Sequence, residues 1–254
     1  MSIKSKVFAA AAALTLVGGV GSIAALSADA ATPSCGHDCL DLFSREFGTH
    51  QQPNYVMDVW RQGAKVGQPV ILFRTSNTDP AEDFNTAFQG KTSEFNEAGL
   101  VSNAVALHYG CAKQFGTHSC TPGSVDDPAF ETEYAPYGVD SGLCVGVAST
   151  AVQNEGVSLQ PCGVSARTVW ILDLNDSPST FNHDYIPLIN GSDTNFSHPF
   201  VLTYPKNGFP TDRPRPQLLV QNLTGFTQGH FPHGTPIGNV DDNQLWGADW
   251  GILR

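Results

Sequence analysis

An internal repeat constrains the fold of this chain more than any other feature of its sequence. The first copy runs from Tyr55 to Phe84 and contains a strand pattern, a glycine-rich turn, a second strand pattern and a closing aromatic residue. The second copy runs from Leu143 to Trp170 in the same order, and a weaker third copy runs from Gln217 to Trp246. The closing aromatic residues of successive copies are 86 and 76 positions apart. Three all-β units of similar length predict a closed sheet with pseudo-threefold symmetry, because closure removes exposed strand edges.

The expected strands are short, rich in β-forming residues and bounded by Gly, Pro, Asn or Asp. They cover residues 55–60, 69–73, 143–147, 157–160, 200–204 and 217–220. The 25 glycines and 17 prolines fit many strands joined by many turns, and a charged fraction of 15% is low for a protein of long helices. A single helix is expected from Asp38 to Phe47, where Leu42, Phe43 and Phe47 have helical spacing and Gly48 follows.

The N-terminus has the pattern of a secretory signal peptide. Lys4 and Lys6 precede an apolar run over residues 7–26, which ends at Ala28-Asp29-Ala30. The alternative is a membrane anchor helix, because the run is nearly long enough to span a bilayer. Cleavage after Ala30 would leave 224 residues (254 minus 30) with a net charge of −12, since two lysines and one aspartate would be removed. We therefore expect an exported protein, either extracellular or associated with the cell wall.

All six cysteines follow the expected cleavage site, an even number in an oxidising compartment. Fifteen pairings are possible, and local spacing favours Cys35–Cys39, Cys111–Cys120 and Cys144–Cys162. The alternative for the segment Cys35-Gly36-His37-Asp38-Cys39 is a zinc site, but no second Cys/His pair follows at zinc-finger spacing. We expect disulfides, with no metal ion and no cofactor.

The stretch from Gly142 to Trp170 resembles one repeat of the ricin-type β-trefoil lectins. The family repeat has a Cys-Leu-Asp-Val-like strand, a Leu-x-x-Cys strand linked to it by a disulfide, and a Gln-x-Trp ending. Leu143-Cys144-Val145-Gly146-Val147, Leu159-Gln160-Pro161-Cys162 and Thr168-Val169-Trp170 match these parts, and Gln244-Leu245-Trp246 matches the ending directly. The resemblance implies an all-β, β-trefoil fold with long loop insertions at residues 85–140 and 171–216. It covers about half of the expected mature chain.

The resemblance also implies roles for particular residues. Phe84, Trp170 and Trp246 are expected to pack in the shared core rather than to contact sugar. In the family, an acid on the first strand of a repeat and an Asn or Asp before Gln-x-Trp bind the sugar. Asp58 has the acid position in the first copy, and Asn243 and Gln244 have the other positions in the third. Gly146 replaces the acid in the second copy and Leu219 stands near it in the third, so no copy has a complete set.

Other clusters favour structural explanations. His230 and His233, with Asp241 and Asp242, are a possible metal set, but the Phe231-Pro232 between the histidines favours an exposed loop. The acidic pairs Asp126-Asp127 and Glu131/Glu133 lack the spaced oxygen ligands of a calcium loop and are expected to form a solvated face. The segment Phe209–Pro216 carries two arginines between prolines and is expected to be an extended connecting loop rather than a site for an acidic partner.

These patterns together predict a signal peptide (residues 1–30) and one β-trefoil domain (31–254) with units near 50–135, 136–210 and 211–254. The expected function is carbohydrate binding without catalysis, with glycans or cell-surface polysaccharide as partners. One alternative is a scaffold that binds proteins, for example as an inhibitor, and another is an exported glycan hydrolase. The net charge of −11 argues against nucleic acid and acidic membranes as partners. The sequence has no Gly-x-Ser-x-Gly, phosphate-loop or His-Glu-x-x-His motif.

Overall fold

The computed structural model describes twelve segments of the chain, and all belong to one unit, Thr32–Arg254. They are residues 40–45, 48–49, 52–53, 55–74, 76, 79–110, 112–114, 117–119, 126–172, 185–205, 216–224 and 240–249. The expected signal peptide, the pairs Cys35–Cys39 and Cys111–Cys120, the two histidines 230 and 233 and the arginine–proline segment lie outside these residues. Within them, no helix is long and apolar enough to cross a membrane.

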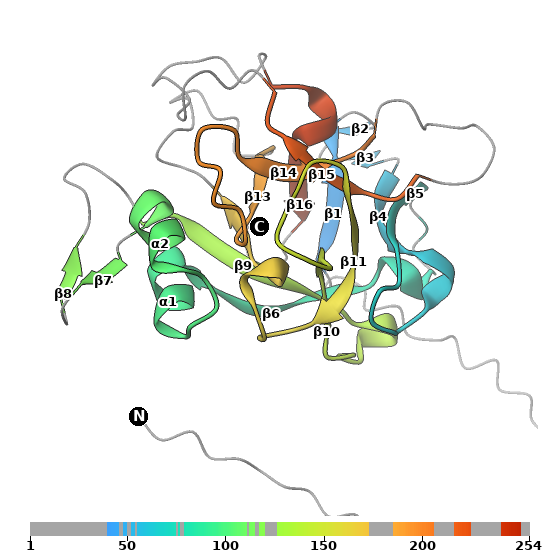
Figure 1. Cartoon of the computed structure of the whole chain (residues 1–254). Coiled ribbons are helices and arrows are strands. Elements are labelled where there is room, and N and C mark those ends of the chain that lie inside the picture. The colour runs from blue at the N-terminus through green and yellow to red at the C-terminus, as the bar shows by residue number, and fades with distance from the viewer. Residues whose placement is uncertain are drawn as a thin grey trace, which may run out of the picture. The chain divides into compact units, whose positions relative to one another are not determined.

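Three units share one order of elements: a barrel strand, a two-stranded hairpin, a 3-10 turn and a second barrel strand (Figure 1). The first unit comprises β1 (Asp41–Ser44), β4 (Tyr55–Val59), β5 (Val70–Arg74), η4 (Pro80–Glu82) and β6 (Phe84–Lys91). The second comprises β9 (Pro128–Tyr134), β10 (Leu143–Val147), β11 (Glu155–Pro161), η6 (Ala166–Thr168) and β12 (Trp170–Leu172). The third comprises β13 (Leu188–Asn190), β14 (Phe200–Thr203), β15 (Leu219–Asn222), η9 (Asp242–Gln244) and β16 (Trp246–Asp249).

The six barrel strands form a closed ring. Antiparallel ladders join β1 to β16, β6 to β9, β9 to β12 and β12 to β13. Backbone hydrogen bonds outside the ladders complete the ring. The amide of Leu40 donates to the carbonyl of Phe84 (2.9 Å), and Ile186 exchanges two bonds with Trp246 (2.8 and 3.0 Å). Each of these six strands therefore has a neighbouring strand on both sides, as expected for a closed barrel.

The three hairpins pack together at one end of this ring. Bridges between Pro69 and Ser158, and between Ile71 and Gln217, join the first hairpin to the other two, and Glu155 pairs with Val220 between the second and third. A six-stranded barrel capped by three hairpins in pseudo-threefold arrangement is a β-trefoil. The expected all-β trefoil fold is therefore confirmed.

The core lies where the barrel meets its hairpin cap. Alternate residues of each strand point inward, so that Met57, Val145 and Leu202 occupy equivalent inner positions of β4, β10 and β14. The largest side chains of this core are all nearly or fully inaccessible to solvent: Phe84, Phe130, Tyr134, Trp170, Tyr204 and Trp246.

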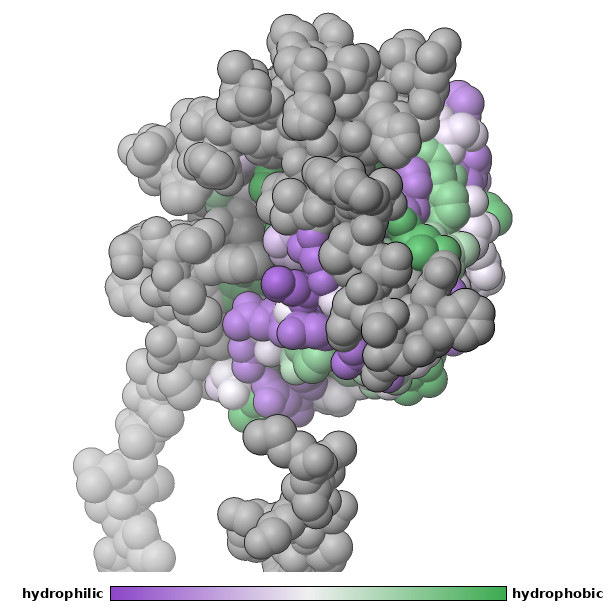
Figure 2. All heavy atoms as spheres, turned by 90° about the vertical axis from the view of Figure 1, so that its left-hand side faces the viewer, coloured by the Kyte–Doolittle hydropathy of each residue, from purple (hydrophilic) through white to green (hydrophobic). Residues whose placement is uncertain are grey.

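An insertion between β6 and β9 adds a second, smaller core. Helices α1 (Thr92–Glu97) and α2 (Asn103–Tyr109) bury Phe95, Val105 and Tyr109 against apolar residues of β12 and β13. The insertion is shorter than the expected span of residues 85–140, because both ends of that span belong to barrel strands. Figure 2 views the side on which these helices lie and shows hydrophilic side chains gathered near the middle of its coloured surface.

Several expectations are wrong, among them the long loop insertion at residues 171–216, because β13 and β14 lie within that span. Residues Asp41–Ser44, expected in a helix, form strand β1, because Leu42 to Ser44 are buried between β16 and β4 and the ladders on both sides outweigh local helical spacing. The expected boundary near residue 211 falls inside a hairpin, because β14 pairs with β15 from Phe200↔Asn222 to Thr203↔Leu219. The third unit therefore begins before β13.

Candidate functional site

A hollow of about 330 Å³ opens at the outer end of the first hairpin. Its wall is formed by the end of β4, the 3-10 turn η3 (Trp60–Gln62) and the start of η4. The lining residues are Asp58, Val59, Trp60, Arg61, Gln62, Asp79 and Ala81. Of the expected sugar-binding residues, only Asp58 lies here.

Asp58 reaches the hollow from strand β4. It pairs with Ile71 of β5, and the alternation of the strand turns its neighbours Met57 and Val59 into the core. Asp58 is 3% exposed and is one of the residues that line the hollow. A carboxylate in this place can accept hydrogen bonds from two adjacent hydroxyl groups of a ligand.

The turn η3 contributes Trp60 and Gln62 to the lining of the hollow, next to Asp58. Arg61 and Gln62 both have φ of 56°, a left-handed backbone that is uncommon for residues other than glycine. Such strained positions concentrate at ligand-binding sites. The backbone of Trp60 is fixed on both sides, since its amide donates to the carbonyl of Pro69 (3.0 Å) and its carbonyl accepts from the Gln68 side chain. The guanidinium of Arg61 lies 5.3 Å from the centre of the Trp60 ring.

Asp79 joins the two sides of the hollow. Its Oδ1 accepts one hydrogen bond from the amide of Ala81 and one from Nε2 of Gln62, both 3.0 Å long. The first bond caps η4, and the second holds the Gln62 amide over the hollow. The sequence did not single out Trp60, Gln62 or Asp79; the Asp79-Pro80 pair, a typical start of a helical turn, was the available signal.

Glu82 lies behind Asp58 and Asp79. Both of its oxygens accept from the amide of Ser76, at 3.0 and 2.9 Å. Burial raises the pKa of the Glu82 carboxyl to about 8, against the lowering effect of the Ser76 bond, and the charges of Asp58, Asp79 and Asp41 raise it further. One carboxylate oxygen from each of Asp58, Asp79 and Glu82 lies within 4.8 Å of the other two.

The pseudo-equivalent positions in the other units carry no acid. In the second unit, a Cβ atom on Gly146 would lie only 2.5 Å from the carbonyl oxygen of Arg167, so the backbone of η6 fills the place of a side chain. In the third unit, Thr203 is at this position, not Leu219 as expected, and its hydroxyl bonds to Val201 and Gln244. The arrangement around Asp58 is thus particular to the first unit.

Gln244 belongs to the scaffold. Its Oε1 accepts from the amide and hydroxyl of Thr224 (2.7 and 2.9 Å), and its Nε2 donates to Thr203 Oγ1 and to the carbonyl of Asn222 (3.2 and 2.9 Å). The side chain is 1% exposed and has no donor or acceptor left for a sugar. These bonds give Gln244 a structural role, and its expected role in sugar binding stays an untested prediction.

Asn243 is also directed inward. Its Nδ2 donates to the carbonyl of Tyr204, and the side chain is 4% exposed. This position is equivalent to Arg167 and Ala81 in the other units, and it fixes η9 to the end of β14. The structure therefore places Asn243 in the fold of the third unit and does not bring it near Asp58.

The three closing aromatic residues lie in the core. Phe84, Trp170 and Trp246 are 0%, 1% and 2% exposed. The two indoles also donate hydrogen bonds, from Trp170 Nε1 to the carbonyl of Val145 and from Trp246 Nε1 to that of Leu202.

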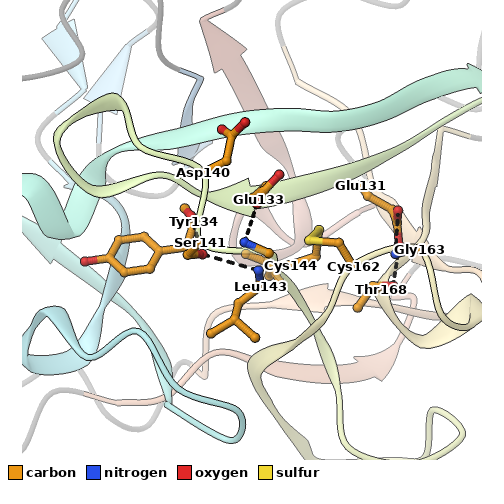
Figure 3. Close-up of a disulfide and its surroundings, with 12 residues drawn as sticks. Glu131, Glu133, Tyr134, Asp140, Ser141, Leu143, Cys144, Cys162, Gly163 and Thr168 are labelled. Carbon is orange, nitrogen blue, oxygen red and sulfur yellow. Dashed lines mark hydrogen bonds between the residues drawn. A yellow bond between two sulfur atoms is a disulfide. The ribbon is translucent and has the colours of Figure 1, made fainter. Parts of the chain in front are cut away.

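The disulfide Cys144–Cys162 ties β10 to the residue after β11 (Figure 3). Two acids expected on a solvated face lie beside it and are buried instead. Glu131 accepts from the amide of Gly163 and the hydroxyl of Thr168, and Glu133 accepts from the amide of Gly142. These carboxylates satisfy backbone donors around the disulfide, which explains why they point inward.

Comparisons with known proteins give structural similarity only. No protein family model matches the chain, and no curated protein matches it. A designed three-fold symmetric protein, ThreeFoil, is similar over 82% of this chain and 96% of its own, with a TM-score of 0.46 and 11% identity. A mosquitocidal holotoxin is similar over 83% of this chain but only 17% of its own, with a TM-score of 0.44 and 11% identity. The β-trefoil fold rests on the strand pairing, independently of these similarities.

Proposed function

We propose that the hollow of the first unit binds carbohydrate. The observation that carries this proposal is the convergence of a carboxylate (Asp58), an amide (Gln62) and an indole (Trp60) on one open hollow. A carboxylate accepts from paired sugar hydroxyls, an amide both donates and accepts, and an aromatic face packs on the C–H surface of the ring. The resemblance of the repeats to ricin-type lectins supports the same function.

The shape of the hollow favours a terminal sugar or a short branch. A volume of about 330 Å³ lies at the small end of the range for ligand sites. The hydrogen bond between Gln62 and Asp79 holds the Gln62 side chain in place before a ligand binds, so little of its side-chain entropy is lost on binding. We infer one sugar site per chain in the described part, in the first unit.

We propose binding rather than hydrolysis. A glycoside hydrolase places an acid and a second carboxylate on opposite sides of the scissile bond. Here Glu82, whose carboxyl pKa is raised by burial and which lies next to Asp58 and Asp79, is 7% exposed and does not line the hollow. Together with the signal-peptide pattern, this supports an exported lectin whose partners are glycans of a cell surface or extracellular polysaccharide.

A glycan array probed with the purified protein tests the proposal. We expect retention of a restricted set of glycans, with Trp60→Ala lowering affinity at least about tenfold because the stacking surface is removed. Trp60→Phe keeps an aromatic face and should retain most of the affinity. Val164→Ala, at an exposed residue of the second unit, is the matched control and should bind as the wild type does. The proposal fails if no glycan is retained, or if Trp60→Ala binds as well as the control.

A further inference from the structure

We propose that Asp58, Asp79 and Glu82 form a binding site for a divalent cation of the calcium type, between the hollow and the Glu82 carboxylate behind it. The three carboxylates come from the end of β4 and both ends of η4, and their ligand oxygens lie within 4.8 Å of one another. Oxygen-only ligands of this charge suit a hard cation, and calcium tolerates irregular geometry. Water from the hollow can complete the coordination shell, because Asp58 and Asp79 also line it.

Comparison with the third unit shows that the first unit lacks a hydrogen-bond donor at the position of Glu82. There, the amide of Gln244 bridges Thr224 on its oxygen side and Thr203 with Asn222 on its nitrogen side. Glu82 has the position of Gln244, Ser76 that of Thr224, and Asp58 that of Thr203. The Glu82 carboxylate repeats the bond on the oxygen side, to the amide of Ser76. The donating NH2 of Gln244 has no counterpart in Glu82, whose carboxylate instead has an oxygen within 4.8 Å of oxygens of Asp58 and Asp79, so a positively charged ligand fits among the three.

A buried hydroxyl provides a second, independent observation. Tyr134 is 0% exposed, and its hydroxyl has no hydrogen-bond partner within the described structure. Tyr134 pairs with Phe84, two residues after Glu82, so it lies next to η4. Burial raises its pKa and the charges of Asp58, Asp83 and Asp79 raise it further, as expected for a hydroxyl in the vicinity of these carboxylates. Figure 3 shows its ring pointing away from the disulfide. An oxygen of this kind is satisfied by a cation or by a water molecule that the cation holds.

Calcium titration of the purified protein, after treatment with a chelator and without sugar, tests the proposal. We expect binding of one calcium ion by calorimetry and a higher melting temperature in calcium than in chelator. Terbium luminescence provides a second readout, because Trp60 lines the same hollow and can sensitise a bound terbium ion.

The variant Glu82→Gln separates ligand loss from misfolding, because it copies the arrangement that Gln244 has in the third unit. We expect it to fold normally in chelator and to bind calcium at least about tenfold more weakly than the wild type. Asp140→Asn, which removes an exposed carboxylate bonded to Asn85, is the matched control and should bind calcium as the wild type does.

Two results would overturn the proposal. One is a folded wild-type protein that shows neither heat nor thermal stabilisation at millimolar calcium, which would leave a proton shared between Glu82 and Asp58 as the explanation of their closeness. The other is a Glu82→Gln variant that binds calcium as tightly as the wild type. Sugar is absent from every arm, so a failure of glycan binding leaves this result standing, and the reverse also holds.

Discussion

The indole of Trp170 donates a 3.0 Å hydrogen bond to the main-chain carbonyl of Val145, across the core from β12 to β10. Trp246 repeats this bond to Leu202 in the third unit, at 2.8 Å. Phe84 has the equivalent position in the first unit and has no donor for Met57. All three units therefore have an aromatic ring at this position, but only the second and third units have the hydrogen bond.

Trp170→Phe should destabilise the fold by about 1–3 kcal/mol, because it removes this bond and leaves a small cavity in the core. Urea denaturation provides the measurement. Trp60→Phe, outside the core, serves as the control and should change stability by less than about 0.5 kcal/mol. Equal stability of both variants would show that the indole bond contributes nothing.

Gln244→Ala should destabilise the fold by about 2–4 kcal/mol, since the amide of Thr224 and the carbonyl of Asn222 lose buried partners. The comparison is Gln221→Ala, whose amide bonds Asn154 at the surface and whose loss should be nearly neutral. A small effect at Gln244 would favour a role in ligand binding after all, which glycan binding by the variant would then have to show.

Gly146→Ala should cost about 1–3 kcal/mol, because the new methyl group would meet the carbonyl oxygen of Arg167 at 2.5 Å. We also expect Gly146→Asp to destabilise the protein without creating a second sugar site. Thermal denaturation and the glycan array measure the two effects. A stable Gly146→Asp variant with increased sugar-binding stoichiometry would contradict the inference that η6 closes this position.

Replacement of both Cys144 and Cys162 by serine should cost about 3 kcal/mol, as expected for a cross-link between residues 18 positions apart. The loss arises mainly from the freer unfolded chain. The wild-type protein under reducing conditions should show part of the same shift in the urea midpoint. An unchanged midpoint in the double variant would mean that the ladder between β10 and β11 and the bonds of Glu131 suffice without the cross-link.

Asp193 should make stability depend on pH. Burial raises its pKa above the ordinary 3.8, although the amides of Asn195, Phe200 and Thr194 lower it in part. An acid whose pKa is raised by folding stabilises the protein fully below its unfolded pKa, and this contribution is lost as the pH rises through the folded pKa. The stability of the wild type relative to Asp193→Asn should therefore fall as the pH rises above about 4. A constant difference between pH 4 and 7 would exclude this effect.

The sequence predicted the fold best where paired strands are close together in the chain. The second hairpin was predicted well, because Leu143–Val147 and Val157–Gln160 are close in the chain and a disulfide joins them. The third hairpin was divided between two units, because a long segment separates β14 from β15 and only their pairing reveals that they belong together. Strand β1 was expected to be a helix, because four residues with two adjacent apolar side chains fit either periodicity.

The site was only partly predictable, because its residues come together through tertiary structure and not through a local sequence pattern. Asp58 could be placed from its position in a strand that resembles the lectin repeat. Trp60, Gln62 and Asp79 gather around it through a left-handed turn and a capped 3-10 turn, which the sequence pattern does not specify. Asn243 and Gln244 match the family motif, but their hydrogen bonds show that the motif serves the barrel in this unit.

The pairing of β1 with β16 has a consequence for how the chain matures. Asp41 and Asp249 face each other although they are 208 positions apart. Because β16 is the last strand to be synthesised, β1 cannot form this ladder until almost the whole chain is available. One edge of β1 stays unpaired until then. A chain cut short before Trp246 would keep that edge exposed and would tend to aggregate. The closed ring therefore forms only after synthesis of the chain is almost complete.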